Sequence, residues 1–213
     1  RRALPKFDPT LDLTWHLLTA EGLPRPWDAQ PLFGRRSPLE LEVGCGKGLF
    51  LRNAAKADAR RDFLGIEISR KYARFAAGQL AKRQLRNARV VQADAQQVFA
   101  TCLPAGVLAA VHIYFPDPWW KKRHHKRRLM NARFLQRVQQ ALQPGGQLHF
   151  WTDVEPYFAQ SLELLQQETD LVGPFPVGEA GDEYPMEYRT HFERRMRLHD
   201  KAVYRSRFSK REA

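Results

Sequence analysis

The chain has 213 residues, 43% of them hydrophobic, which is enough for one α/β domain with its own core but too short for two full domains. No apolar run approaches the roughly 18 residues that a membrane span needs. The two cysteines, Cys45 and Cys102, exclude a disulfide framework and a cysteine zinc cluster, so we expect a reducing, cytoplasmic setting. A formal net charge of +12 indicates a polyanionic partner.

Strands and helices alternate after an irregular, proline-rich segment at 1–38, in which one short helix is predicted at 11–18. Residues 39–213 form the folded core of a single domain. Strands are predicted at 39–43, 63–68, 89–92, 110–115 and 147–152, and helices at 48–57, 70–85, 128–142 and 156–168. Two further strands near 188–196 and 202–208 would form an antiparallel C-terminal hairpin. The pattern predicts an α/β fold with a mostly parallel central sheet. Because the chain begins at Arg1 without a methionine, we expect the native N-terminus to lie upstream.

A glycine loop follows the first core strand and reads Glu42-Val43-Gly44-Cys45-Gly46-Lys47-Gly48. Glycines allow a tight turn and a close approach of the backbone to a ligand. A dinucleotide fingerprint would need glycine where Leu49 stands, and a Walker loop would need Ser or Thr at Gly48. The G-x-G-x-G form instead resembles the nucleoside-binding loop of class I S-adenosylmethionine-dependent methyltransferases. Cys45 has no histidine beside it in sequence and is interpreted as a small loop residue.

Carboxylates follow the next two strands. Glu67 ends the second strand and could accept hydrogen bonds from both hydroxyls of a ribose. Asp94 follows the third strand and could meet an adenine amino group, or could serve only as the N-cap of the next helix. Because ligands bind at the carboxyl ends of parallel strands, the loop and the two acids together predict a nucleoside site.

The fourth strand runs into Phe115-Pro116-Asp117-Pro118-Trp119-Trp120, and a basic run follows. Two prolines stiffen the turn around Asp117, where no structural need for a carboxylate is evident. Residues 121–137 hold eight Lys and Arg and no acid, and residues 189–213 hold nine against three. The net positive charge of these two segments together exceeds that of the whole chain, which favours contact with nucleic acid. A solvated helix face would also explain the first segment, and an ordinary basic C-terminus would also explain the second. The two tryptophans either pack in the core or stack on bases.

The segment Phe-Pro-Asp-Pro-Trp with its basic run closely resembles the tRNA (guanine-N7-)-methyltransferase family. Residues 142–146, 152–157 and 190–193 resemble further blocks of this family, so the resemblance covers about 38–208. It implies a class I methyltransferase (Rossmann-like) fold and methyl transfer from S-adenosyl-L-methionine to N7 of a tRNA guanine, at position 46 in the variable loop. Two departures are Trp120, where the family more often has Pro or His, and the absence of a common glycine near Leu198.

The resemblance also implies roles for individual residues. Asp117 would be the catalytic residue. The cofactor would be bound by Glu42, Gly44, Gly46, Gly48, Glu67, Asp94 and Asp117. The guanine or its nucleotide would be held by Lys121, Asp153, Thr190, His191, Phe192 and Glu193. The tRNA would be contacted by Arg123, His124, His125, Lys126, Arg127 and Arg128. The adjacent His124 and His125 do not easily face one metal ion together with His112, so we expect no metal. Because no apolar run is long enough to span a membrane, we also expect no membrane partner.

Guanine N7 offers a lone pair and has no proton to lose, so its methylation needs no strong general base. Asp117 could hold a base edge and stabilise the positive charge that passes to the purine. One alternative is a class I methyltransferase that acts on another RNA, such as an rRNA adenine or guanine. Another is a non-catalytic RNA-binding module with a degenerate loop, which the intact Glu67, Asp94 and Asp117 disfavour.

Overall fold

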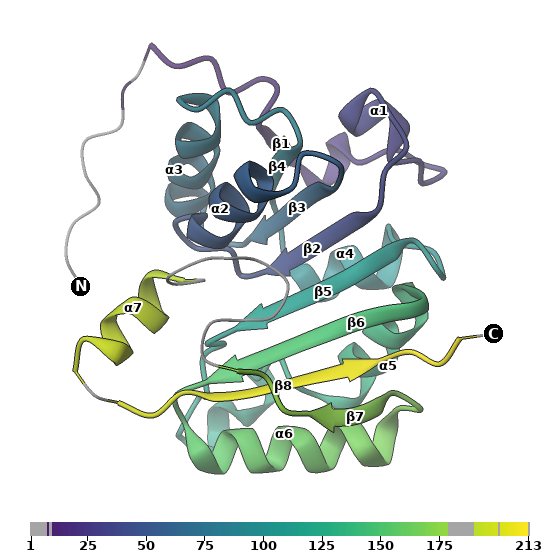
Figure 1. The fold of residues 1–213 in the computed structure, drawn as a ribbon, viewed down its shortest axis with the longest axis vertical. Helices are drawn as coiled ribbons and strands as arrows, with labels where there is room; N and C mark the ends of the chain where they lie inside the picture. The colour runs from purple at the N-terminus through teal and green to yellow at the C-terminus, as the bar shows by residue number, and fades with distance from the viewer. Residues whose placement is uncertain (1–7, 9, 179–189, 200, 213) are drawn as a thin grey trace.

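The computed structural model describes residues 8, 10–178, 190–199 and 201–212, which form one sheet with helices on both faces (Figure 1). The strand order is β1-β4-β3-β2-β5-β6-β8-β7. All neighbouring pairs from β1 to β6 are parallel, whereas β8 is antiparallel to both β6 and β7. The strands are Leu17–Thr19 (β1), Leu39–Val43 (β2), Asp62–Glu67 (β3), Ala88–Gln92 (β4), Leu108–Tyr114 (β5), Leu142–Thr152 (β6), Val172–Phe175 (β7) and Tyr204–Ser209 (β8). The predicted fold class is confirmed.

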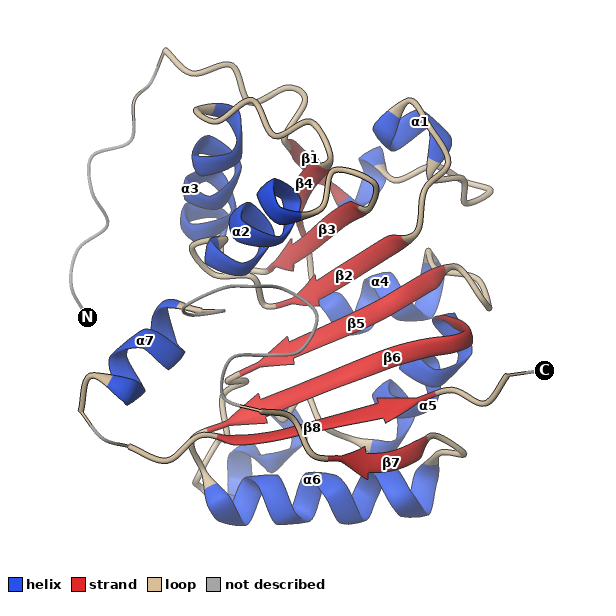
Figure 2. Cartoon of the chain, in the orientation of Figure 1, coloured by secondary structure: helices blue, strands red, loops and turns tan. Residues whose placement is uncertain are grey.

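Helices cover both faces of the sheet and enclose two hydrophobic clusters (Figure 2). Helices α2 (Leu49–Ala57) and α3 (Arg70–Ala81) cover one face, and α4 (Ala95–Thr101), α5 (Ala132–Ala141) and α6 (Glu155–Glu168) cover the other. The remaining helical elements are α1 (Gln30–Phe33), α7 (His191–Arg197) and the 3-10 turns Ala20–Gly22 and Lys122–Arg127. No helix in the described ranges has the length and apolar character needed to span a membrane.

The central strands are buried on both faces, as parallel strands between helices usually are. In β2, Leu39, Leu41 and Val43 join the cluster under α4 and α5, so Glu40 and Glu42 face the α2–α3 side. Glu40 is fully buried and is compensated there, because its Oε2 lies 2.8 Å from His112 Nε2 and its Oε1 accepts from Arg61. Polar groups inside this layer therefore need partners on neighbouring strands.

The predicted helix at 11–18 is wrong. Its last residues belong to β1, which pairs with β4 at the edge of the sheet. Upstream, the carboxylates of Asp8 and Asp12 accept hydrogen bonds from the backbone N–H groups of Thr10 and Thr14. Such Asx turns offer the backbone an alternative to helical hydrogen bonds, which explains why the segment does not coil.

The predicted strand near 188–196 is also wrong where it is described; residues 188 and 189 lie outside the described part. Thr190 is the N-cap of α7, and its Oγ1 accepts from the backbone N–H of Glu193 at 2.9 Å. The sequence Thr190-x-x-Glu193 is a capping-box signature that outweighs the apparent alternation. The antiparallel partner of β8 is instead β7, which was not predicted and which carries Pro174 on the sheet edge.

Gly48 controls how α2 packs on α3. It has φ of +69°, and a Cβ built on it would lie 2.9 Å from Ala76 Cβ. Gly48→Ala should therefore lower the free energy of unfolding by about 2–5 kcal/mol, the sum of left-handed strain and overpacking. Gly34→Ala is the matched control, because Gly34 has φ of +73° but open space around it. It should cost only about 1–2 kcal/mol. Equal losses in urea unfolding would show that helix contact at Gly48 contributes nothing.

Candidate active site

A cleft of about 530 Å³ opens at the carboxyl ends of β2, β3, β4 and β5. The chain leaves β2 toward β3 and β4 on one side and returns to β5 and β6 on the other, so the cleft lies at the point where the strand order reverses. Ligands of doubly wound sheets bind at this point. The lining residues are Val43, Gly44, Ile66, Glu67, Ile68, Ala93, Asp94, Ala95, Gln96, Tyr114, Phe115, Pro116, Asp117, Trp119, Arg127 and Leu129.

Glu67 connects the glycine loop to the start of α3. Its Oε2 accepts from the backbone N–H of Gly46 at 2.9 Å, and its Oε1 accepts from that of Ser69 at 2.8 Å. Each carboxylate oxygen keeps a second lone pair after these bonds. The side chain is buried yet lines the cleft, so a hydroxyl donor entering the cleft would find an oriented acceptor.

Glu42 lies behind the glycine loop and is not among the residues that line the cleft. Burial, reinforced by the neighbouring charge of Glu67, raises the pKa of the Glu42 carboxyl well above its ordinary value, and the backbone N–H of Leu51 opposes this only in part. Its Oε2 has no hydrogen-bond partner within the described structure. Burial and the nearby carboxylate of Glu67 therefore both disfavour the charged form of Glu42.

Asp94 is the N-cap of α4, as one of its two predicted roles required, and it also lines the cleft. Its Oδ1 accepts from the backbone N–H of Gln96 at 2.8 Å and caps α4. The same side chain is exposed and lines the cleft. Capping holds the carboxylate in place at the strand end, so the structural role does not remove it from the site.

Asp117 sits on the lip of the cleft in a strained turn. Phe115 and Trp119, two residues away on either side, have φ of +51° and +44°. Non-glycine residues seldom adopt this left-handed conformation, and such strain concentrates at functional sites. The Asp117 side chain is exposed and lines the cleft. The turn therefore presents one carboxylate toward the space that Glu67 and Asp94 also face.

The basic loop, residues 121–128, extends from this turn. The guanidinium of Arg127 lies 5.2 Å from the centre of the Trp119 ring, and His124 meets that ring edge-on at 5.7 Å. Trp119 is half-buried in the cleft wall, whereas Trp120 is 67% exposed and so available for stacking. Lys121, Arg123 and Lys126 are exposed; the side chain of His125 lies outside the described part.

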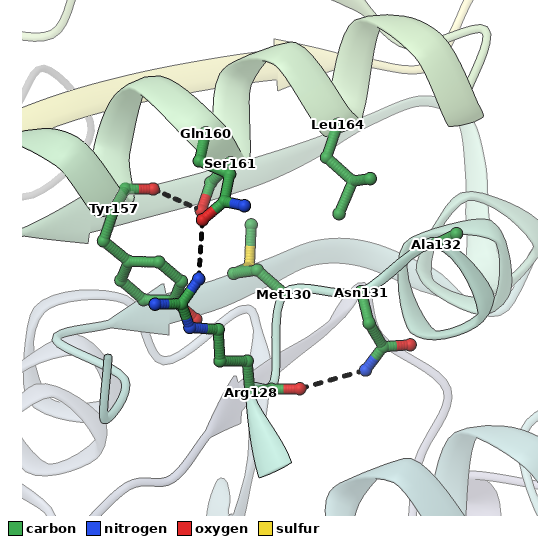
Figure 3. Close-up of a pocket in the computed structure, with 8 residues that line it drawn as sticks. All are labelled: Arg128, Met130, Asn131, Ala132, Tyr157, Gln160, Ser161 and Leu164. Carbon is green, nitrogen blue, oxygen red and sulfur yellow. Dashed lines mark hydrogen bonds between the residues drawn. The ribbon is translucent and has the colours of Figure 1, made fainter. Parts of the chain in front are cut away.

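Arg128 has a different environment from the rest of the basic loop. Its Nε donates to the Pro118 carbonyl at 2.7 Å, and its Nη1 donates to Gln160 Oε1 at 2.6 Å. Its guanidinium also covers the ring of Tyr157, whose pKa burial raises to about 12 (Figure 3). Arg128, Tyr157 and Gln160 line a smaller pocket of about 250 Å³. The contacts of Arg128 with Tyr157 and Gln160 anchor the loop to α6. Arg128 is thus placed to hold the loop rather than to present a free cation.

Helix α7 carries the other predicted substrate residues beside the cleft. Phe192 packs against Phe115 with ring centres 4.8 Å apart. Thr190 caps the helix, and the buried Glu193 pairs with Arg205 at 3.3 Å, so both stabilise α7 itself. Burial and the charges of Lys47, Arg52 and Arg194 lower the pKa of His191. Asp153 is half-buried directly after β6, and it does not line the cleft.

Tyr114 is a cleft residue that the sequence analysis missed. Its hydroxyl lies 2.9 Å from His112 Nδ1, and His112 Nε2 in turn contacts Glu40. This chain of hydrogen bonds connects the cleft wall to the interior of the sheet. The sequence pattern that could have revealed Tyr114 is the alternation of His112 and Tyr114 on one face of the buried strand β5. No group of three or more side chains that could hold a metal occurs in the described part of the chain.

Solved structures with a similar fold include several methyltransferases. The aminoglycoside resistance methyltransferase NpmB1 aligns with a TM-score of 0.57 and 20% identity, over 91% of this chain and 94% of that chain. A family model described as "Putative methyltransferase" matches residues 36–206. The family match agrees with the glycine loop and with the acids at the strand ends, which lie where the strand order reverses. The chain is therefore a class I, S-adenosyl-L-methionine-dependent methyltransferase.

Curated relatives narrow this class. The tRNA (guanine-N(7)-)-methyltransferase of Rhodopirellula baltica is 44% identical over 217 aligned residues, which cover 99% of this chain and 80% of the relative. The enzyme of the same name from Alkalilimnicola ehrlichii is 42% identical and covers 95% and 86%. The chain belongs to the tRNA (guanine-N(7)-)-methyltransferase family, and the resemblance seen in the sequence is confirmed.

The raised pKa of Glu42 has a measurable consequence. The folded state keeps a proton that the unfolded state loses near the ordinary value of 4.5, so stability should fall as the pH rises above that value toward the folded pKa. Glu42→Gln cannot ionise and should escape this loss. Urea unfolding between pH 4.5 and 8 should show the variant gaining on the wild type by up to about 1.4 kcal/mol per pH unit within that window. Parallel curves would mean that Glu42 does not ionise on unfolding.

Proposed function

We propose that this protein transfers the methyl group of S-adenosyl-L-methionine to N7 of a guanine in tRNA, with guanine 46 of the variable loop as the target. The observation that carries the proposal is that Asp117 shares one cleft with Glu67 and Asp94. Two tryptophans and then the basic loop follow Asp117 in the chain. The names of relatives more than 40% identical support the same reaction.

The cleft suits the cofactor on physical grounds. Its volume is adequate for a nucleoside with an amino-acid arm. Gly44 has no atom within 4 Å of the place a Cβ would occupy, so a ligand can approach this part of the loop closely. Glu67 would accept from the ribose hydroxyls, and Asp94 would accept from the adenine amino group. Bound there, S-adenosyl-L-methionine supplies an electrophilic methyl group on a sulfonium.

The protein's own contribution would be positioning and electrostatics. N7 of guanine is nucleophilic without deprotonation, which agrees with a cleft wall that has carboxylates and no histidine among its described lining residues. Asp117 would hold the guanine in line with the methyl group, and its negative charge would stabilise the positive charge as it develops on the purine. The strained turn would fix the position of this carboxylate at the lip of the cleft.

The basic loop would orient the tRNA through phosphate contacts. Exposed cations supply affinity without reading sequence, whereas Trp120 could stack on a base beside the target. Arg128 would act indirectly, because its contacts to Pro118 and α6 fix where the loop emerges.

Nucleoside mass spectrometry tests the reaction and its site. A tRNA transcript incubated with labelled cofactor should acquire 7-methylguanosine, and a transcript with adenine at position 46 should acquire none. Label appearing at another tRNA guanine would refute only the position. Label in 16S or 23S rRNA but not in tRNA would favour the alternative RNA methyltransferase, and no transfer to either RNA would favour a binding module.

Asp117→Asn preserves the shape of the side chain and removes its charge. Single-turnover methyl transfer at saturating tRNA and cofactor should fall on the order of 10²-fold, while both binding affinities change little, because the charge acts mainly on the transition state. Asp170→Asn, at an exposed site between α6 and β7, is the matched control and should react like the wild type. An unchanged rate for Asp117→Asn would remove this residue from catalysis.

Glu67→Ala should weaken binding of S-adenosyl-L-methionine by about 1–3 kcal/mol, since a charged acceptor for the ribose and the anchor for Gly46 are both lost. Calorimetry with the free cofactor measures this directly. Asp153→Ala removes a carboxylate that does not line the cleft and should leave cofactor affinity unchanged. If both variants bind the cofactor like the wild type, the ribose does not contact Glu67.

A further inference from the structure

A third basic segment lies outside the two that dominate the sequence. Residues 47–89 contain twelve Lys and Arg and only three acids. Acidic residues elsewhere in the chain offset this excess in the net charge of the whole protein. Two of those acids, Asp62 and Glu67, are buried. The segment builds α2 and α3, which lie side by side on one face of the sheet (Figure 1). Most of its positive charge is therefore not neutralised within the segment.

The packing of α2 on α3 brings two arginines together. Gly48 contacts Ala76, which places Arg52, one turn further along α2, near the end of α3. Arg83 folds back along α3 and donates to the carbonyl and side-chain oxygens of Gln79 at 2.9 and 3.0 Å. Burial, and next the charge of Arg83, lower the pKa of Arg52. The two guanidinium groups are thus electrostatic neighbours.

The same positive surface continues to the mouth of the cleft. Besides burial, the charges of Lys47, Arg52 and Arg194 lower the pKa of His191 at the start of α7. The next residue, Phe192, packs on Phe115 at the cleft wall. We call this surface the cationic strip: it comprises Arg83, Arg52, Lys47, His191 and Arg194. It begins in the turn after α3, crosses α2 and the glycine loop, and ends on α7 beside the cleft.

Ion pairing distinguishes Lys47, Arg52 and Arg83 from other cations on the same side of the molecule. Arg60 pairs with Asp58, and Arg61 pairs with Asp58 and Glu40. No carboxylate within the described part of the chain forms an ion pair with Lys47, Arg52 or Arg83; Arg52 donates to Asn53, and Arg83 donates to Gln79. Clustered like charges raise the energy of the free protein, and a polyanion laid across them would lower it.

We propose that the cationic strip binds the sugar–phosphate backbone of the RNA substrate away from the target nucleotide. This rests on the proposed function, from which it takes tRNA as the partner. The cleft then opens between two cationic surfaces, the basic loop beyond Asp117 and the strip beyond α7. A nucleotide entering the cleft would have its flanking backbone held on both sides, and the strip would contribute affinity without base specificity.

The test is the double variant Arg52→Gln/Arg83→Gln. Glutamine retains side-chain length and helix propensity and removes only the charge. The dissociation constant for tRNA should rise about 5- to 30-fold at 0.1 M salt, and the slope of log affinity against log salt should flatten by about 1–2 units. Cofactor affinity and the single-turnover rate at saturating tRNA should not change, because neither arginine lines the cleft.

Two comparison variants keep the result interpretable. Arg60→Gln removes an exposed cation that has Asp58 as its partner and should leave the salt slope unchanged. Arg123→Gln/Arg127→Gln in the basic loop should flatten it. If the strip variant matches the wild type while the basic-loop variant does not, the strip is refuted and the proposed function stands. If wild-type protein fails to methylate tRNA, the proposed function fails, and the salt slopes still decide whether the strip binds RNA. Should the double variant unfold, Arg83→Glu at its exposed position replaces it under the same criteria.

Discussion

The carboxylate of Glu67 is the constraint on which the site depends. It receives one backbone N–H from the glycine loop after β2 and another from the start of α3 after β3. Two segments that are joined through different strands are thereby fixed to each other. Gly65, two residues earlier, makes the approach possible, because a Cβ there would lie 2.3 Å from Leu51 Cδ1 and 2.8 Å from Cys45 Sγ. The nucleoside end of the cleft is therefore preorganised before any ligand enters.

The end of the cleft that carries Asp117 is held from two directions. Toward the interior, Tyr114 is hydrogen-bonded to His112, which contacts the buried Glu40. These bonds fix the side chains at the carboxyl end of β5. Toward the surface, Arg128 connects the Pro118 carbonyl to α6. The strained turn that carries Asp117 lies between these two anchors. Left-handed residues persist only where the surroundings over-determine them, and these anchors supply that condition.

Sequence reasoning predicted the parallel core, and it placed Gly44, Glu67 and Asp117 at the edge of the sheet where they line the cleft, because both follow from local patterns. It also expected Glu42, Gly46 and Gly48 there, and these do not line the cleft. Continuous apolar runs identify buried strands, and glycines or acids directly after them identify the ligand edge. It failed at 11–18, where Asx turns compete with the helix, and at α7, where a capping box outweighs alternation. It also placed Arg128 and Glu193 among the substrate contacts. Their partners, Gln160 and Arg205, are distant in the chain, and no local pattern reveals such pairs.

The 35 Lys and Arg residues of the chain include two groups with different roles. Arg35, Arg61 and Arg205 pair with the buried acids Asp62, Glu40 and Glu193, and they stabilise the sheet edge, β2 and α7. Each such pair is electrically neutral and contributes nothing to a long-range field. Other cations belong to the basic loop and to the cationic strip, which flank the cleft. A protein that needed only solubility would intersperse acids among them. Under the proposed function, their concentration beside the cleft would serve the capture of a large polyanion, since the field would draw the RNA toward the place where we propose that its base reacts.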